Sequence, residues 1–225
     1  MTGGTLTNNA TGNVIGLTTI SGTGAVENAG QLGSVLNQAT GTFNNNSGGS
    51  AGAVNNLGTF TNDAGATTGA VTNSGTGTNA GTIASLTNTG GTFGNTGTIN
   101  TTANVTGGTL TNGATGDVNG TTFISGTGIV ENSGQLAGVS NQLGGTFNNN
   151  NGGTAGAVGN AGTATNDLGG TIASLTNTGG TFGNSGDITG VANVSGGTLT
   201  NNSTGTIGGI TTITAAGIVE NSGQL

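Results

Sequence analysis

The sequence has no basic residue, because Lys, Arg and His are all absent. Nucleic-acid binding needs cations that neutralise phosphate, so this absence argues against a nucleic-acid partner. An anionic membrane surface would repel a chain with a net charge of −7. No apolar run approaches the length of a membrane-spanning helix, and we therefore expect no membrane insertion.

Cys, Pro, Trp and Tyr are also absent, whereas Gly accounts for 52 of the 225 residues. The absence of Cys excludes disulfides and thiol chemistry but leaves the compartment open. A composition dominated by Gly, Ser, Thr and Asn suggests disorder. Disordered chains are usually rich in Pro and in charge, however, and only seven residues here are charged. The apolar residues also keep a regular spacing, which favours a folded repeat protein.

The chain contains two long repeats and the start of a third. The string TIASLTNTGGTFGN at 82–95 returns unchanged at 171–184. We expect a single domain over 1–225, built from long units at 3–106, 107–195 and 196–225, the last of them partial.

A shorter repeat of the form GTLTN occurs thirteen times, and its central residues are 16 to 20 positions apart. Eleven of these central residues are large and apolar, and we predict that they form a core column: Leu6, Val26, Phe43, Phe60, Phe93, Leu110, Val130, Phe147, Phe182, Leu199 and Val219. Phe43 and Phe60 should stack, whereas Gly77 and Ala164 should leave gaps. The second long unit lacks a counterpart of the Gly77 repeat, as expected if each repeat is one stackable coil.

Each repeat has three short apolar-centred stretches separated by Gly and Asn. The other two inward positions fall at Ile83, Ile99, Val118, Ile172, Ile188 and Ile207, and at Val54, Val71, Leu86, Val158 and Leu175. Stretches this short cannot form helices, because Gly and Asn interrupt each one before an amphipathic turn repeats. The pattern predicts an all-β parallel β-solenoid of about 13 coils of about 17 residues, with three short strands per coil.

Two columns of Asn support this model. The first is Asn8, Asn28, Asn45, Asn62, Asn79, Asn95, Asn112, Asn132, Asn149, Asn166, Asn184, Asn201 and Asn221. The second is Asn37, Asn56, Asn73, Asn88, Asn104, Asn141, Asn160, Asn177 and Asn193. We expect both at corners, where Asn tolerates left-handed backbone. Stacked Asn side chains can also hydrogen-bond along the axis, so the first column predicts a structural ladder.

These strings give the chain a resemblance to the passenger regions of autotransporter and two-partner-secreted adhesins. Such regions carry runs like LTNTGGTF at 86–93 and IVENSGQL at 129–136, and the resemblance covers the whole chain. It implies a right-handed parallel β-helix on the outside of a bacterial cell, poor in Cys and active in cell adhesion and biofilm formation. No secretion signal follows Met1, so we expect that the signal has been removed or that the chain is an excerpt.

An enzyme is the first alternative, because parallel β-helices also include polysaccharide lyases and glycoside hydrolases. Lyases need a strong base, and the basic side chains are absent. Glu27, Glu131 and Glu220 occupy equivalent positions five or six coils apart, or roughly 24–29 Å, which is too far for paired carboxylates to act together. We expect no catalytic residues, no cofactor and no metal site, and we interpret the isolated acids as solubilising charges.

An ice-binding solenoid is the second alternative. The residue before the central position is Thr in ten of the thirteen short repeats: Thr5, Thr42, Thr59, Thr76, Thr92, Thr109, Thr146, Thr163, Thr181 and Thr198. A flat Thr array resembles the ice-binding face of some solenoid antifreeze proteins. Thr is also a common exposed strand residue, and Ala25, Ile129 and Ile218 interrupt the column.

The sequence therefore favours a structural or adhesive segment of a secreted, non-enzymatic surface fibre or filament. Polar and nearly uncharged faces could pair side by side between molecules, or bind a host or glycan surface ligand. Leu225 ends the string IVENSGQL, where its counterparts run on into another coil. We expect that the chain continues into a longer protein or that its ends stack on other copies.

Overall fold

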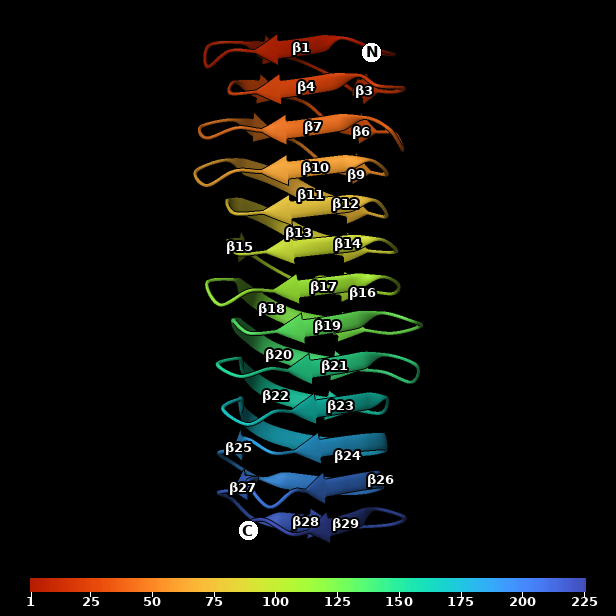
Figure 1. The fold of residues 1–225 in the computed structure, drawn as a ribbon, viewed down its shortest axis with the longest axis vertical. Helices are drawn as coiled ribbons and strands as arrows, with labels where there is room; N and C mark the ends of the chain where they lie inside the picture. The colour runs from red at the N-terminus through yellow and green to blue at the C-terminus, as the bar shows by residue number, and fades with distance from the viewer.

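Each strand of the computed structural model, which describes residues 1–225, pairs in parallel with an equivalent strand one coil further along the chain. The elements comprise 29 strands and no helix. Figure 1 shows the result as a stack of coils with the two termini at opposite ends. Twelve steps of about 4.8 Å give this stack a length of roughly 60 Å.

One face of the stack, here called the first face, contains the GTLTN-type repeats. It is formed by β1 (Thr5–Asn8), β4 (Ala25–Asn28), β7 (Thr42–Asn45), β10 (Thr59–Asn62), β12 (Thr76–Asn79), β14 (Thr92–Asn95), β17 (Thr109–Asn112), β19 (Ile129–Asn132), β21 (Thr146–Asn149), β23 (Thr163–Asn166), the ends of β24 (Thr171–Asn184) and β26 (Ala192–Asn201), and β29 (Ile218–Asn221). The thirteen segments pair in register. The predicted parallel β-solenoid of about 13 coils is thus confirmed.

Two further faces complete each coil. The second face has β2 (Asn13–Val14), β5 (Gln31–Leu32), β8 (Ser50–Ala51), β15 (Thr98–Ile99), β25 (Asp187–Ile188) and β27 (Thr206–Ile207). The third has β3 (Thr18–Ile20), β6 (Val35–Asn37), β9 (Val54–Asn56), β16 (Ala103–Val105) and β28 (Thr211–Ile213). In other coils one strand runs through both faces: β11 (Thr67–Asn73), β13 (Thr82–Asn88), β18 (Asp117–Ile124), β20 (Gln135–Asn141) and β22 (Thr154–Asn160). β24 spans all three faces, and β26 spans the third and the first.

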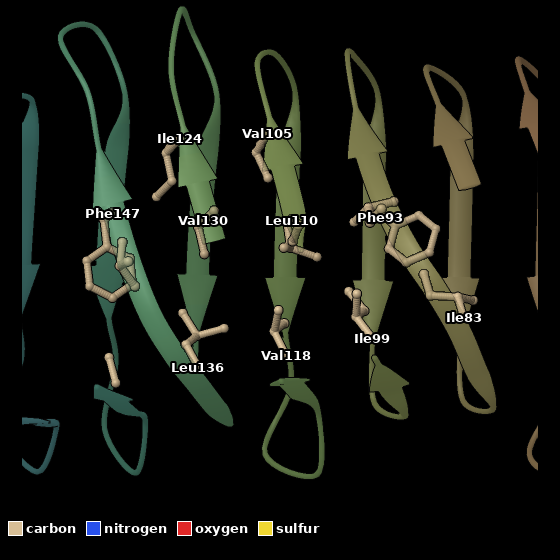
Figure 2. Packing of buried hydrophobic residues seen from close by; sticks show 14 of the residues in the cluster. Ile83, Phe93, Ile99, Val105, Leu110, Val118, Ile124, Val130, Leu136 and Phe147 are labelled. Carbon is tan, nitrogen blue, oxygen red and sulfur yellow. The ribbon is translucent and has the colours of Figure 1, made fainter. Parts of the chain in front are cut away.

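The core is a thin apolar column between the three faces, with 33 buried residues in one cluster. Figure 2 shows how three successive strands contribute to it, with Val105, Leu110 and Val118 lying together inside the coils. The rings of Phe43 and Phe60 do stack, with centroids 5.5 Å apart. Of the eleven large residues proposed for the central column, only Leu6 and Val219, in the first and last coils, are less than fully buried.

The corners use Gly rather than Asn for left-handed backbone. Thirteen Gly residues have positive φ, and the one other residue that does is Ala215. The expectation that Asn adopts this conformation was therefore wrong. The Asn residues of the first column instead end the strands of the first face, where an extended backbone directs their side chains inward.

Candidate functional site

The first Asn column forms an unbroken ladder of hydrogen bonds along the stack. In each coil the Nδ2 group donates to Oδ1 of the equivalent Asn in the next coil, over twelve bonds of 2.7–2.9 Å. The members are buried from Asn8 to Asn201, and Asn221 in the last coil is exposed. Every bond has the same direction, so the amide dipoles are aligned and can polarise one another.

The same side chains also satisfy the backbone at the corners. Asn28 Nδ2, for example, donates to the Asn45 side chain at 2.7 Å and lies 3.1 Å from the carbonyl oxygen of Ser50. A buried carbonyl without a partner is costly, and the turns that leave the first face would otherwise contain several. The ladder therefore joins each coil to the next in two ways, through the Asn side chains and through a backbone carbonyl group of the next coil.

The second Asn column is divided into two shorter ladders. Hydrogen bonds of 2.7–2.8 Å join Asn37, Asn56, Asn73 and Asn88, and then Asn141, Asn160 and Asn177. The assignment of Asn104 and Asn193 to this column was wrong. Val105 and Val194 pair with the last Asn of each run and are buried, so their neighbours Asn104 and Asn193 lie on the opposite side of the strand.

The two ends of each short ladder differ. Asn37 and Asn141 begin the runs, and their Oδ1 atoms are buried without a hydrogen-bond partner. The preceding coils contain Ile20 and Ile124 at these positions, which cannot donate. At the other end, the amide of Asn88 donates to the carbonyl oxygen of Gly107 at 3.1 Å. Each run thus begins with an Asn whose Oδ1 atom has no hydrogen-bond donor and ends with an Asn whose amide group has an acceptor.

All three Glu side chains bridge coils on the outer surface: Glu220 accepts from the Thr200 hydroxyl of the preceding coil at 3.2 Å, and the other two accept from Asn residues of the next coil. The carboxylate of Glu27 accepts hydrogen bonds from Asn44 at 2.6 Å and Asn46 at 3.1 Å. Glu131 repeats the arrangement with Asn148 and Asn150 in the next coil, at 2.7 and 3.1 Å. Sequence reasoning missed this contact, although the string GTFNNN follows one coil after each of these two Glu residues.

The outward Thr column lies on the first face, where its members are exposed or half-buried. The pairing brings it into two uninterrupted runs: Thr42, Thr59, Thr76, Thr92 and Thr109, and Thr146, Thr163, Thr181 and Thr198. Ile129 separates them, and Ala25 separates Thr5 from the first run.

Two shallow grooves mark the surface between the second and third faces. One, of about 340 Å³, is mainly apolar and includes Leu17, Val35 and Leu36. The other, of about 330 Å³, includes the polar residues Asp117 and Gln135. No three carboxylates gather as potential metal ligands. The structure contains no helix of the length and apolarity needed to cross a membrane.

No protein-family model matches the chain. No curated protein matches it either. Among solved structures, it is similar to the crystal structure of a TibC-catalysed hyper-glycosylated TibA fragment, with 22% sequence identity and a TM-score of 0.49. That match covers 98% of this chain and 93% of the other.

Proposed function

We propose that the chain is a structural and adhesive segment of a secreted bacterial surface fibre, without enzymatic activity. The observation that supports this most directly is the unbroken first Asn ladder inside one continuous parallel sheet. Each coil adds the same backbone and amide bonds as the one before it, so such a chain can be lengthened coil by coil into a rod. A rod of this kind holds distant groups apart and presents repeated surfaces along its length.

The chemistry of the outer surface suits contact rather than catalysis. Exposed Thr and Asn side chains offer both donors and acceptors, and the chain has no Lys, Arg, His or Cys to act as a base or nucleophile. An extracellular location fits the same composition, because trypsin-like proteases find no Lys or Arg to cleave after. Uncharged polar faces can also pair between copies, which adds side-by-side self-association to the proposal.

Surface display tests the adhesive part of this proposal. The chain is fused to a display carrier in a non-adherent bacterial strain, and adhesion to host cells and settling in suspension are measured. The control fusion lacks residues 63–70, a deletion that shifts register and should abolish the fold. We expect more adhesion or faster settling than with the control or the carrier alone. Equal values for all three would contradict an adhesive role.

An ice-binding β-solenoid is the second candidate, and the in-register Thr runs of five and four residues favour it. The Glu–Asn bridges and Ile129 interrupt the array on the same face. Thermal hysteresis separates the candidates. A freezing-point depression that the intact chain causes and the double variant Thr76→Val/Thr92→Val does not would favour ice binding. If the intact chain causes no freezing-point depression, ice binding is contradicted and the fibre proposal stands.

A further inference from the structure

The polar groove lies on the second face, across the first residues of β18, β20 and β22. Asp117 pairs with Gln135, and Gln135 pairs with Thr154, so the three side chains form one outward column over successive coils. Asn119 lies two residues beyond Asp117 along β18 and also lines the groove. A volume of about 330 Å³ falls at the small end of the range for small-molecule sites.

A β-bulge borders the groove. The pairing of β18 with β20 shifts register between Val118 and Thr121, because β18 has one residue more at this corner. Asn119 precedes this extra residue and is exposed on the same side of β18 as Asp117. The next two coils have Ala137 and Gly156 at this position, and a Cβ atom at Gly156 would collide with the carbonyl oxygen of Ala137. The two following coils thus have no bulky side chain at the position of Asn119.

The side chains of Asp117, Asn119 and Gln135 are free to bind a ligand. Only the backbone groups of Asp117 and Gln135 make hydrogen bonds, and the Asn119 side chain has no partner. The carboxylate accepts and the two amides both donate and accept, whereas the Thr154 hydroxyl donates to the carbonyl oxygen of Gly134 at 3.5 Å and can still accept. Neighbouring hydroxyl groups of a ligand would match this mixture, because each hydroxyl also donates and accepts.

We propose that this groove binds a neutral sugar, which would give the proposed adhesive fibre a glycan ligand; the inference therefore rests on that function. An anionic ligand would be repelled by Asp117, and the chain has no basic side chain to offset the repulsion. A metal ion would need several converging oxygen ligands, and the groove has one carboxylate. Because the site is open to water, binding is in the millimolar range for a single sugar.

The first long unit provides an internal comparison. A shift of 104 residues places Asn13, Ile15 and Gln31 where the second unit has Asp117, Asn119 and Gln135. The column Asn13–Gln31 pairs in the same way, whereas the carboxylate and the amide at the third position are missing. The corner that follows differs, because Gly16 has a left-handed backbone and Gly120 continues β18. The substitution Asp117→Asn therefore gives a side chain that this fold already accepts at the equivalent position of the column.

The test is a ¹⁵N NMR titration of the full chain with galactose, glucose, mannose and N-acetylglucosamine, each up to roughly 100 mM. At least one sugar should cause saturable shifts confined to amides at 117–119, 135–137 and 154–156. Asp117→Asn should weaken this binding about tenfold or more, since it removes a charge-assisted acceptor. The matched control Asp187→Asn makes the same change on the second face outside the groove and should bind like the unmodified chain.

Three results would overturn the groove proposal: no saturable shift with any sugar, shifts spread over the whole chain, or equal affinity in Asp117→Asn and the unmodified chain. Binding of methylammonium but of no sugar would show that the ligand class is wrong. The display assay separates this inference from the proposed function. Adhesion without sugar binding would contradict only the proposal of a sugar site in the groove. Sugar binding with adhesion no higher than that of the carrier alone would contradict the adhesive role.

Discussion

A Cβ atom at Gly77 would lie 2.5 Å from Cδ2 of Phe93, in the adjacent coil. The Phe93 ring thus occupies the space that the missing side chain leaves, and the expected gap in the core column at Gly77 is filled. Ala164 precedes Phe182 in the same manner in the second long unit. A small residue followed by Phe is therefore a packing pair, and its two members should be energetically coupled.

The first prediction tests that coupling with a double-mutant cycle. Gly77→Ala should destabilise the chain by about 1–3 kcal/mol, because the added methyl group overpacks the core. Phe93→Leu makes room for the methyl group, so the double variant should be more stable than the sum of the single changes predicts, by about 1 kcal/mol. Urea unfolding followed by circular dichroism measures the three free energies. Additive values would show that Gly77 and Phe93 do not share this space.

The second prediction concerns removal of a whole coil. Asn62 and Asn79 occupy equivalent positions in adjacent coils. Deletion of residues 63–79 joins Asn62 to the residue that follows Asn79, so one whole coil is removed and the fold should survive. The deletion also brings Phe60 next to Phe93, so adding Phe60→Ala should raise the stability of the shortened chain by reproducing the Ala164–Phe182 pair. Deletion of residues 63–70 breaks register and should abolish the fold. Circular dichroism and thermal melting distinguish these outcomes, and similar damage from both deletions would refute the coil boundaries.

The third prediction compares two neighbouring Asn residues on β9. Asn56 is fully buried, accepts from Asn37 at 2.8 Å and donates to Asn73 at 2.7 Å, whereas Asn55 is exposed. Asn56→Ala leaves the buried Oδ1 of Asn73 without a donor and removes one of the three hydrogen bonds of Asn37 Nδ2, so it should lower the unfolding free energy by about 2–4 kcal/mol. Asn55→Ala should change it by less than about 0.5 kcal/mol. Equal effects in urea unfolding would mean that the ladder adds nothing beyond filling turns.

The fourth prediction concerns proteolysis. Proteinase K cleaves beside apolar residues, and most of these face inward along the continuous sheet. The intact chain should therefore resist digestion far longer than the chain unfolded in urea. The first cuts should occur at exposed loop residues, namely Ile15, Leu143 and Ile210. Mass spectrometry of early fragments locates them. Early cuts beside buried residues such as Phe147 would indicate that the coils open readily.

The repeat, the parallel coils and the inward position of residues such as Phe43 could be predicted from the sequence, because alternation and period are local properties that every coil repeats. The sequence also indicated the first Asn column, whose spacing is regular from Asn8 to Asn221. It placed Asn104 in the second column wrongly. The length of a corner decides which of two adjacent residues points inward, and one additional residue reverses the choice.

Contacts that depend on the neighbouring coil could not be predicted in this way and follow from the folded structure. The direction of the Asn ladders, the bridge from Glu27 to Asn44, the Phe93 ring beside Gly77 and the polar groove at Asp117 all join residues about one coil apart. Their geometry follows from the register of pairing and from the local bulge at each corner. A repeat pattern defines which residues share a column, but the packing of one coil on the next decides which of them touch.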